Sequence, residues 1–255
     1  MLSTIFQKIL VGLLILTCLS AFSALSAYRY FFAVNIDDPA FVESDLTSDT
    51  LSIDSLRARF GQNKKIPTAV EKECLVALSH FPEFAQTRID FEYAPISFTM
   101  ESQPKLSFLF LPKSKRQYKI LINSDPRSTN LDYQELSFNG KIGWIGHELG
   151  HIYDYERMST VQIIGLGISY YEDSFRRVVE HRTDQNAIQH GLGDALAEGV
   201  SFLMERGNAR YLSVQDDYYM SVQEIKISSR LRSWVARQHQ KAKKRRKNRM
   251  ERFGP

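Results

Sequence analysis

The sequence predicts an α+β protein in which a small sheet, mixed or antiparallel, is followed by a helical half. Short segments between residues 88 and 123 alternate apolar and polar side chains, which is the period of half-buried strands. From about residue 140 onward, apolar side chains recur at the helical period. The 255 residues, 43% of them hydrophobic and 24% charged, have an ordinary globular composition and suffice for one domain with a sizeable core.

The N-terminal part of the chain contains an apolar segment. Ile9–Ala27 follows Lys8 and carries no charged residue. Residues 1–30 are therefore predicted to be a secretory signal cleaved near Ala24–Ala27, or a single uncleaved membrane anchor. A buried N-terminal core helix is the third interpretation. The first two place the protein in the cell envelope or periplasm, as an exported or membrane-anchored chain.

Residues 31–60 are predicted to be a linker, because Asn35–Asp54 is acidic and rich in serine and threonine. One domain is expected over residues 61–236. We expect it to begin with a helix from about Pro67 to His80, where apolar side chains recur at helical spacing.

Three strands are predicted next, at Arg88–Tyr93, Leu106–Leu111 and Gln117–Asn123. The first and third alternate in polarity, and the second is a short apolar run. The rest of the domain is predicted to be helical, at about 141–157, 172–190, 194–206 and 220–236.

The C-terminus is strongly basic. Residues 237–252 hold nine Lys or Arg and one acidic residue, although the net charge of the whole chain is only +4. Residues 237–255 are predicted to be a solvated, disordered tail. The alternative is attraction to an anionic membrane or polymer, worth about 1 kcal/mol for each basic residue near such a surface. An exported chain rarely meets nucleic acid, so nucleic acid is not an expected partner. The residues that would contact an anionic surface are Lys241, Lys243, Lys244, Arg245, Arg246 and Lys247.

The segment GWIGHELGHIY, residues 143–153, carries an HExxH pattern with histidines at His147 and His151. Residues four apart lie on one face of a helix, so both imidazoles can hold one metal ion. Glu148 lies one position round the helix and can act as a general base on a water molecule that the metal activates. The alternative is a core helix whose two histidines make ordinary hydrogen bonds.

A catalytic zinc site needs a third protein ligand and an open fourth position. Arg157 stands six residues after His151, where metzincins carry their third histidine, so the metzincin pattern is excluded. The remaining candidates lie in the helix predicted at 172–190, and they are Glu180, His181, Asp184 and His190.

Arg177, Glu180 and Asp184 share one face of that helix. Glu180 can ligate the metal, and Asp184 can accept the outer N–H of a ligating histidine. Arg177 can hold a carboxylate. The alternative is a surface ladder of charges worth about 0.2–0.5 kcal/mol per pair.

Together these motifs resemble the gluzincin metallopeptidases. The arrangement is similar to that of the membrane-associated branch, which includes the prenyl-protein endopeptidases and their heat-shock relatives. It consists of HELGH, about thirty residues, and then Ser174-x-x-Arg177-x-x-Glu180-x-x-Thr183-Asp184. Thr183 stands where that branch usually has alanine, and the branch's multiple membrane-spanning helices have no counterpart in the sequence. The resemblance covers residues 143–187. The whole chain is also similar to small exported proteins of unassigned function that share the GHELGH core.

The resemblance implies a zincin-like fold with one Zn²⁺ ion. His147, His151 and Glu180 would be the zinc ligands, Glu148 the general base, and Asp184 a partner of a ligating histidine. The predicted function is therefore that of a zinc metalloendopeptidase of the cell envelope acting on an unidentified peptide or protein. One alternative is a non-catalytic envelope protein with a structural zinc site and a basic tail. Another is hydrolysis of a non-peptide amide at the same site.

Four further features bear on this hypothesis. In zincins an edge strand holds the peptide by backbone pairing, and Gln117–Asn123 is either that strand or an ordinary one. The apolar segment Val161–Ile168 is either core or a lip that meets substrate or membrane. Glycines weaken the HExxH helix by up to about 1 kcal/mol each, which predicts that Gly146 or Gly150 lies close against another element. The candidate donors to the reaction's oxyanion are Tyr170, Tyr171, Tyr211, Tyr218, Tyr219 and His190.

Overall fold

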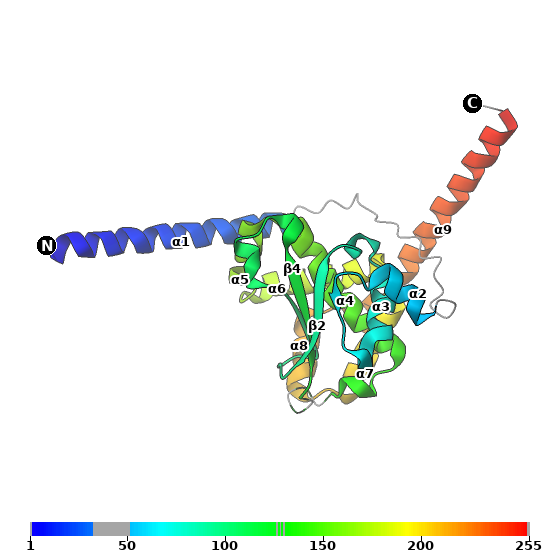
Figure 1. The fold of residues 1–255 in the computed structure, drawn as a ribbon, viewed down its shortest axis with the longest axis horizontal. Helices are drawn as coiled ribbons and strands as arrows, with labels where there is room; N and C mark the ends of the chain where they lie inside the picture. The colour runs from blue at the N-terminus through cyan, green and yellow to red at the C-terminus, as the bar shows by residue number, and fades with distance from the viewer. Residues whose placement is uncertain (1, 33–51, 126, 128, 130, 254–255) are drawn as a thin grey trace.

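The computed structural model of the protein describes residues 2–32, 52–125, 127, 129 and 131–253. Most of the predicted linker, residues 33–51, lies outside this range. The described residues form nine α-helices and a small sheet of four strands (Figure 1), which confirms the predicted α+β class.

The sheet has the strand order β1–β2–β4–β3. β1 (Lys64–Lys65) and β4 (Gln117–Asn123) run parallel to β2 (Arg88–Ala94), whereas β3 (Met100–Pro104) runs antiparallel to β4. Of the two predicted alternatives, the mixed sheet is the one formed.

Of the two interpretations of Gln117–Asn123, the ordinary sheet strand is the one observed, and the strand predicted at Leu106–Leu111 is wrong. β4 lies between β2 and β3, so both of its edges are already hydrogen-bonded and it cannot pair with a substrate. The edge strands are β3 and the two-residue β1, and the sequence analysis missed both. The strand predicted at Leu106–Leu111 is instead a 3-10 helix over Leu106–Leu109, because only Phe108 of this apolar run is buried while Leu106 and Phe110 are exposed.

Five of the nine helices correspond to predicted ones: α3, α4, α6, α7 and the first half of α9. The apolar segment after α4 forms α5, and α8 was not predicted. α2 occupies the end of the predicted linker, where Leu56 and Phe60 are buried. The bounds are α1 Leu2–Phe32, α2 Ile53–Phe60, α3 Glu71–Ser79, α4 Phe138–Arg157, α5 Thr160–Ser169, α6 Asp173–Gln189, α7 Gly193–Arg206, α8 Ala209–Tyr218 and α9 Val222–Phe253.

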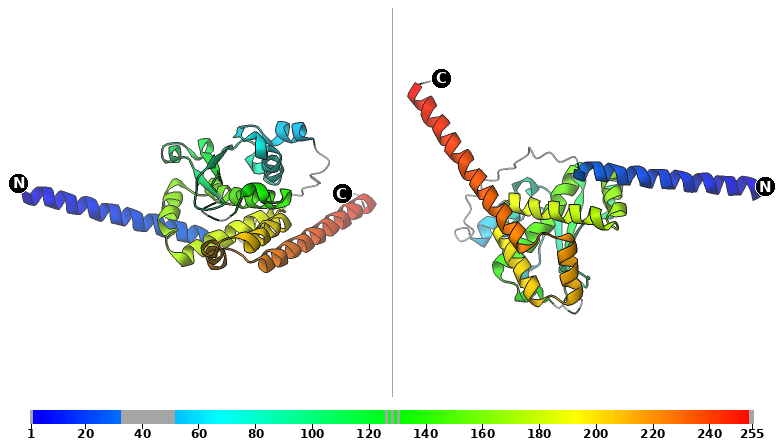
Figure 2. Two further views of the ribbon diagram at one scale, coloured as in Figure 1. Left: turned by 90° about the horizontal axis from the view of Figure 1, so that it is seen from below. Right: turned by 180° about the vertical axis from the view of Figure 1, so that it is seen from behind.

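The basic C-terminal segment is helical and not disordered as predicted, because α9 continues through it as far as Phe253. This part of α9 projects away from the domain (Figure 2). The side chains of Lys241, Lys243, Lys244 and Arg245 are exposed, and those of Arg246 and Lys247 lie outside the described residues.

α4 is the central helix of the domain. It begins at the N-cap Ser137, whose side chain accepts a hydrogen bond from the backbone N–H of Gly140. It lies between the sheet and a layer formed by α6, α7 and the first turns of α9 (Figure 2). Ile145, Leu149 and Ile152 are fully buried along it.

Two glycines of α4 explain how closely its neighbours approach. A Cβ atom at Gly143 would collide with the backbone of Ala195 in α7, and one at Gly150 would meet the carbonyl of Thr183 in α6 at 2.8 Å. Gly146 is similarly tight against Leu192. The prediction that the HExxH glycines lie against other elements is confirmed.

α1 leaves the domain as a single helix, and its C-terminal turns pack against α5 and α6 (Figures 1 and 2). Among the helices whose side chains the structure describes, none is long and apolar enough to cross a membrane.

Candidate metal centre

Three side chains from two helices converge on one buried point. α4 contributes His147 and His151, one turn apart on the same face, and α6 contributes Glu180. The Oε2 atom of Glu180 lies 3.2 Å from Nε2 of His147 and 3.4 Å from Nε2 of His151. One ligand atom from each residue falls within 4.8 Å of the others, so the group could hold a metal ion.

The outer nitrogens of both histidines are hydrogen-bonded. Nδ1 of His147 lies 2.8 Å from Oδ1 of Asp184, whose Oδ2 accepts from the backbone N–H of Met220. Nδ1 of His151 lies 3.1 Å from the hydroxyl of Thr183, which donates its own proton to the carbonyl of Val179. With both Nδ1 atoms donating, both Nε2 lone pairs face the centre, as metal ligation requires.

The surroundings of Glu180 fit a bound cation. Its side chain is fully buried, and its Oε2 lies against the Nε2 atoms of both histidines. Burial alone would raise the pKa of Glu180, but the positive charge of His151 and a hydrogen bond from His147 hold it below its usual range. The pKa of His147 is raised, because hydrogen bonds to Asp184 and Glu180 outweigh burial.

Glu148 stands beside this cluster without ligating it. It is 5% exposed, and its Oε2 has no hydrogen-bond partner among the described residues. Burial raises the pKa of Glu148, and the charges of His147 and His151 oppose that shift. A buried carboxylate with a raised pKa and a free oxygen is suited to accepting a proton.

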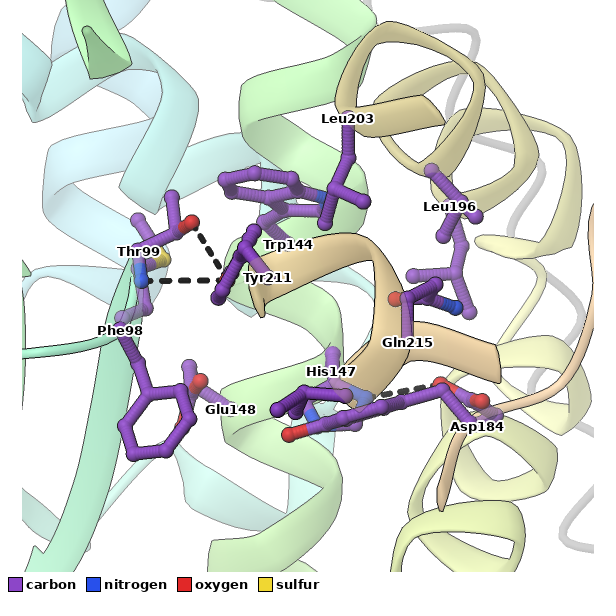
Figure 3. A pocket seen from close by; sticks show the side chains of 14 residues that line it. Phe98, Thr99, Trp144, His147, Glu148, Asp184, Leu196, Leu203, Tyr211 and Gln215 are labelled. Carbon is purple, nitrogen blue, oxygen red and sulfur yellow. Dashed lines mark hydrogen bonds and ion pairs between the residues drawn. The ribbon is translucent and has the colours of Figure 1, made fainter. Parts of the chain in front are cut away.

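His147 and Glu148 line two cavities. A cleft of about 540 Å³ is bounded by β3 on one side and by α5 and α6 on the other. A small pocket of about 60 Å³ shares both residues with the cleft and is shown in Figure 3. Its walls are mixed, with the apolar side chains of Trp144, Leu196, Val200 and Leu203 and the polar side chains of Thr99, Asp184 and Gln215. The core role predicted for α5 is confirmed for Ile163 and Leu166, which are buried, whereas the more exposed Ile164 lines the cleft.

The free edge of β3 faces the larger cleft. Asn123 N–H donates to the carbonyl of Thr99, and Lys105 N–H donates to that of Gln117, so the odd-numbered residues of this segment bond to β4. By the alternation of an antiparallel ladder, the backbone groups of Met100 and Ser102 point away from β4. The carbonyl of Ser102 is 3.4 Å from the hydroxyl of Tyr155 on α4.

The structure separates the candidate oxyanion donors. The Tyr170 hydroxyl donates to Oε1 of Glu180, and the ring of Tyr219 lies 5.6 Å from that of His147. The Tyr211 hydroxyl bonds to Thr99 at the small pocket (Figure 3). Tyr171 is 92% exposed at the rim of the cleft.

Two predicted site residues lie elsewhere. His190 is fully buried, where its ring nitrogens bond to the Asn186 carbonyl and to Glu83, so it faces the core and is not an oxyanion donor. Arg177 is exposed and donates to the Asp217 carbonyl at 2.5 Å, so it holds no site carboxylate. Of the other residues proposed, Tyr218 donates to Asp173, away from the ligands.

Arg176, which the sequence analysis passed over, lines the cleft in place of Arg177. Its guanidinium lies 4.1 Å from the ring centroid of Tyr218 and 5.2 Å from that of Tyr170. Arg176 precedes Glu180 by four residues and Arg177 precedes it by three, so helical spacing alone did not distinguish them.

No family model, curated protein or solved structure matches the chain. The candidate centre therefore rests on its own geometry and on the motif resemblance over residues 143–187.

Proposed function

We propose that the protein is a zinc-dependent metallopeptidase of the cell envelope with a zincin-like catalytic domain. The observation that carries this proposal is the convergence of His147, His151 and Glu180 on one buried point. Two imidazoles and one carboxylate are a ligand set of catalytic zinc sites, which keep one position open. Structural zinc sites usually close with four protein ligands, whereas three converge among the described residues.

Zinc, when bound there, would polarise a substrate carbonyl and acidify a water molecule. Glu148 is our general base, because its free Oε2 lies next to the ligands and its raised pKa favours taking up a proton. It would accept the proton of the attacking water and pass it to the leaving amine. Tyr219 is our oxyanion donor, since burial raises the pKa of its hydroxyl and keeps it protonated, whereas the Tyr170 hydroxyl donates its single proton to Glu180.

A peptide substrate is favoured by the free edge of β3. The N–H and C=O of Met100 and the N–H of Ser102 are available for pairing with an extended backbone. The small pocket beside Trp144 would then take one compact side chain of the substrate.

The second candidate, a non-catalytic envelope protein, draws support from the projecting basic part of α9. Its exposed residues Lys241, Lys243, Lys244 and Arg245 would attract an anionic membrane or polymer. The same contact would localise a peptidase, so it does not separate the two candidates.

The test combines metal analysis with one conservative substitution. We expect one zinc per chain, general proteolysis of an unfolded protein substrate, and loss of that proteolysis with retention of zinc in Glu148→Gln. Glu205→Gln, at an exposed position of α7, is the matched control and should keep both properties. A purified chain that binds no metal would refute the proposal. Undiminished biological activity of Glu148→Gln would favour the non-catalytic candidate.

A further inference from the structure

The last turns of α1 are built into the domain. Ala27 and Phe31 are buried, and they share a hydrophobic cluster with Phe175 and Val179 of α6. The ring of Tyr28 stacks on Phe175 with centroids 4.5 Å apart, and Phe31 meets the same ring edge-on at 5.5 Å. This packing is that of a core element.

α5 has a site shaped to receive α1. A Cβ atom at Gly165 would collide with the carbonyl of Ser23, so the two helix backbones touch where no larger side chain fits. Ile163 and Leu166, on either side of Gly165, line the substrate cleft and pack in the cluster that contains Ala27. The last turns of α1 therefore support the wall of the cleft from behind.

α1 also connects the two helices that carry the metal ligands. The hydroxyl of Tyr30 donates to Oδ1 of Asp154, a buried residue of α4, at 2.9 Å. Asp154 also accepts from Arg182 at 3.0 Å and from Asn186 at 3.1 Å, both on α6. The guanidinium of Arg182 lies 4.7 Å from the ring centroid of Tyr30 and 5.4 Å from that of Phe31. Asp154 follows His151 by three residues and Arg182 follows Glu180 by two, so this network lies one turn or less from the ligands.

We propose that the N-terminal helix is retained in the working protein and that its segment Ser23–Phe31 clamps α4 and α6 in the geometry that binds metal. Cleavage near Ala24–Ala27 would leave at most the eight residues 25–32 of the helix. Such a cleavage would remove Ser23, whose backbone packs directly against Gly165 of α5. Of the interpretations of residues 1–30, the clamp favours a retained helix over a cleaved signal.

The inference rests on the metal-binding part of the proposed function and not on peptidase activity. Its first test is the intact mass of the full-length chain, purified with a C-terminal tag after expression with its own N-terminus. We expect the N-terminal helix to be present. A mature chain that begins between residues 25 and 28 and still binds zinc with the affinity of the full chain would overturn the proposal.

The second test compares variants within the clamp and outside it. Phe31→Ala removes a buried ring, Tyr30→Phe removes only the hydroxyl on Asp154, and Gly165→Leu forces α1 away from α5. Phe22→Ala, at an exposed position of the same helix, is the control. Zinc affinity is measured by chelator competition, and melting temperature is measured on the metal-free chains.

We expect Phe31→Ala and Gly165→Leu to lower the melting temperature and weaken zinc binding by about tenfold, as loss of supporting shells does elsewhere. Tyr30→Phe should weaken binding less, and Phe22→Ala should change neither quantity. If Gly165→Leu does not fold, the conservative Tyr30→Phe still tests the clamp. Parental affinity and melting temperature in both Tyr30→Phe and Phe31→Ala would refute it. If the chain binds no zinc, the zinc proposal fails separately, and the melting temperatures and the mass still decide the clamp.

Discussion

Thr183 offers a sharp test of the metal centre, because its hydroxyl is the partner of His151 and the related motif has alanine there. Thr183 is fully buried, donates to the carbonyl of Val179 and lies 3.1 Å from Nδ1 of His151. Thr183→Val keeps the shape of the side chain and removes only the hydroxyl. Thr183→Ser is the matched control, since it keeps the hydroxyl and loses a methyl group.

The effect should fall on metal binding and not on folding. In the metal-free Thr183→Val chain, His151 can move its proton to Nε2, 3.4 Å from Oε2 of Glu180, and so leave no donor unpaired. Metal binding requires the lone pair on Nε2 of His151. The proton must then return to Nδ1, which is buried and has no acceptor in Thr183→Val. An unsatisfied buried donor costs about 1–3 kcal/mol. At about 1.4 kcal/mol per factor of ten, zinc affinity should fall between about 5-fold and 150-fold.

The assay is zinc competition against a chromophoric chelator, alongside thermal melts of the metal-free chains. Thr183→Ser should bind zinc within a few-fold of the parent, and all three metal-free chains should melt at similar temperatures. If Thr183→Val binds zinc as tightly as the parent, then Thr183 does not orient His151 and the tautomer argument is wrong. A large loss of melting temperature in Thr183→Val would instead indicate a structural role.

Three further outcomes follow from the same geometry. Burial raises the folded-state pKa of Glu148, so its contribution to stability is present at low pH and is lost as pH rises through that pKa. The metal-free Glu148→Gln chain should therefore melt at a higher temperature than the metal-free parent at pH 7.5, but not at pH 4. Gly143→Ala places a methyl group against the Ala195 backbone and should cost about 1–3 kcal/mol, measured by urea unfolding, and a parental midpoint would contradict the close approach. Ser102→Pro removes an N–H that faces the cleft, so it should lower kcat/KM about tenfold without lowering the melting temperature. Glu101→Pro should also destabilise the fold, because the N–H of Glu101 bonds to β4. Equal kcat/KM in Ser102→Pro and the parent would exclude substrate pairing with β3.

The parts of the site that the sequence could predict are local ones. The spacing of His147 and His151 fixes their common face, and the same spacing on α6 relates Glu180 to Asp184. Helical periodicity is also a local signal, so α4, α6 and α7 were predicted close to their observed bounds. Local spacing does not determine the distance between two helices. Here that distance depends on the glycines of α4, and their role becomes clear only when the neighbouring helix is seen.

The errors share a non-local cause. The alternation in Gln117–Asn123 shows correctly that it is a strand, but its place between β2 and β3 depends on pairing with segments up to about thirty residues away. β3 has little apolar alternation, because an edge strand beside a cleft buries only Met100 and Ser102. Arg176 and Arg177 differ by 100° around the helix, and only the position of α8, which supplies the Asp217 carbonyl, decides which one faces the cleft.

The glycines of α4 connect the weakness of that helix to the site that it carries. Each glycine lowers helix stability by roughly 0.5–1 kcal/mol relative to alanine, which an isolated helix would not offset. Here the loss is offset by burial, since almost every residue from Ile142 to Gly150 is shielded on all sides by the sheet, α6 and α7. Gly150 admits the Thr183 carbonyl to the surface of α4, which brings the turn of α6 that carries Glu180 within ligand distance of both histidines. A side chain at Gly150 would move α6 outward together with its ligand, so the residue that weakens the helix is also the one that permits the third ligand to reach the centre.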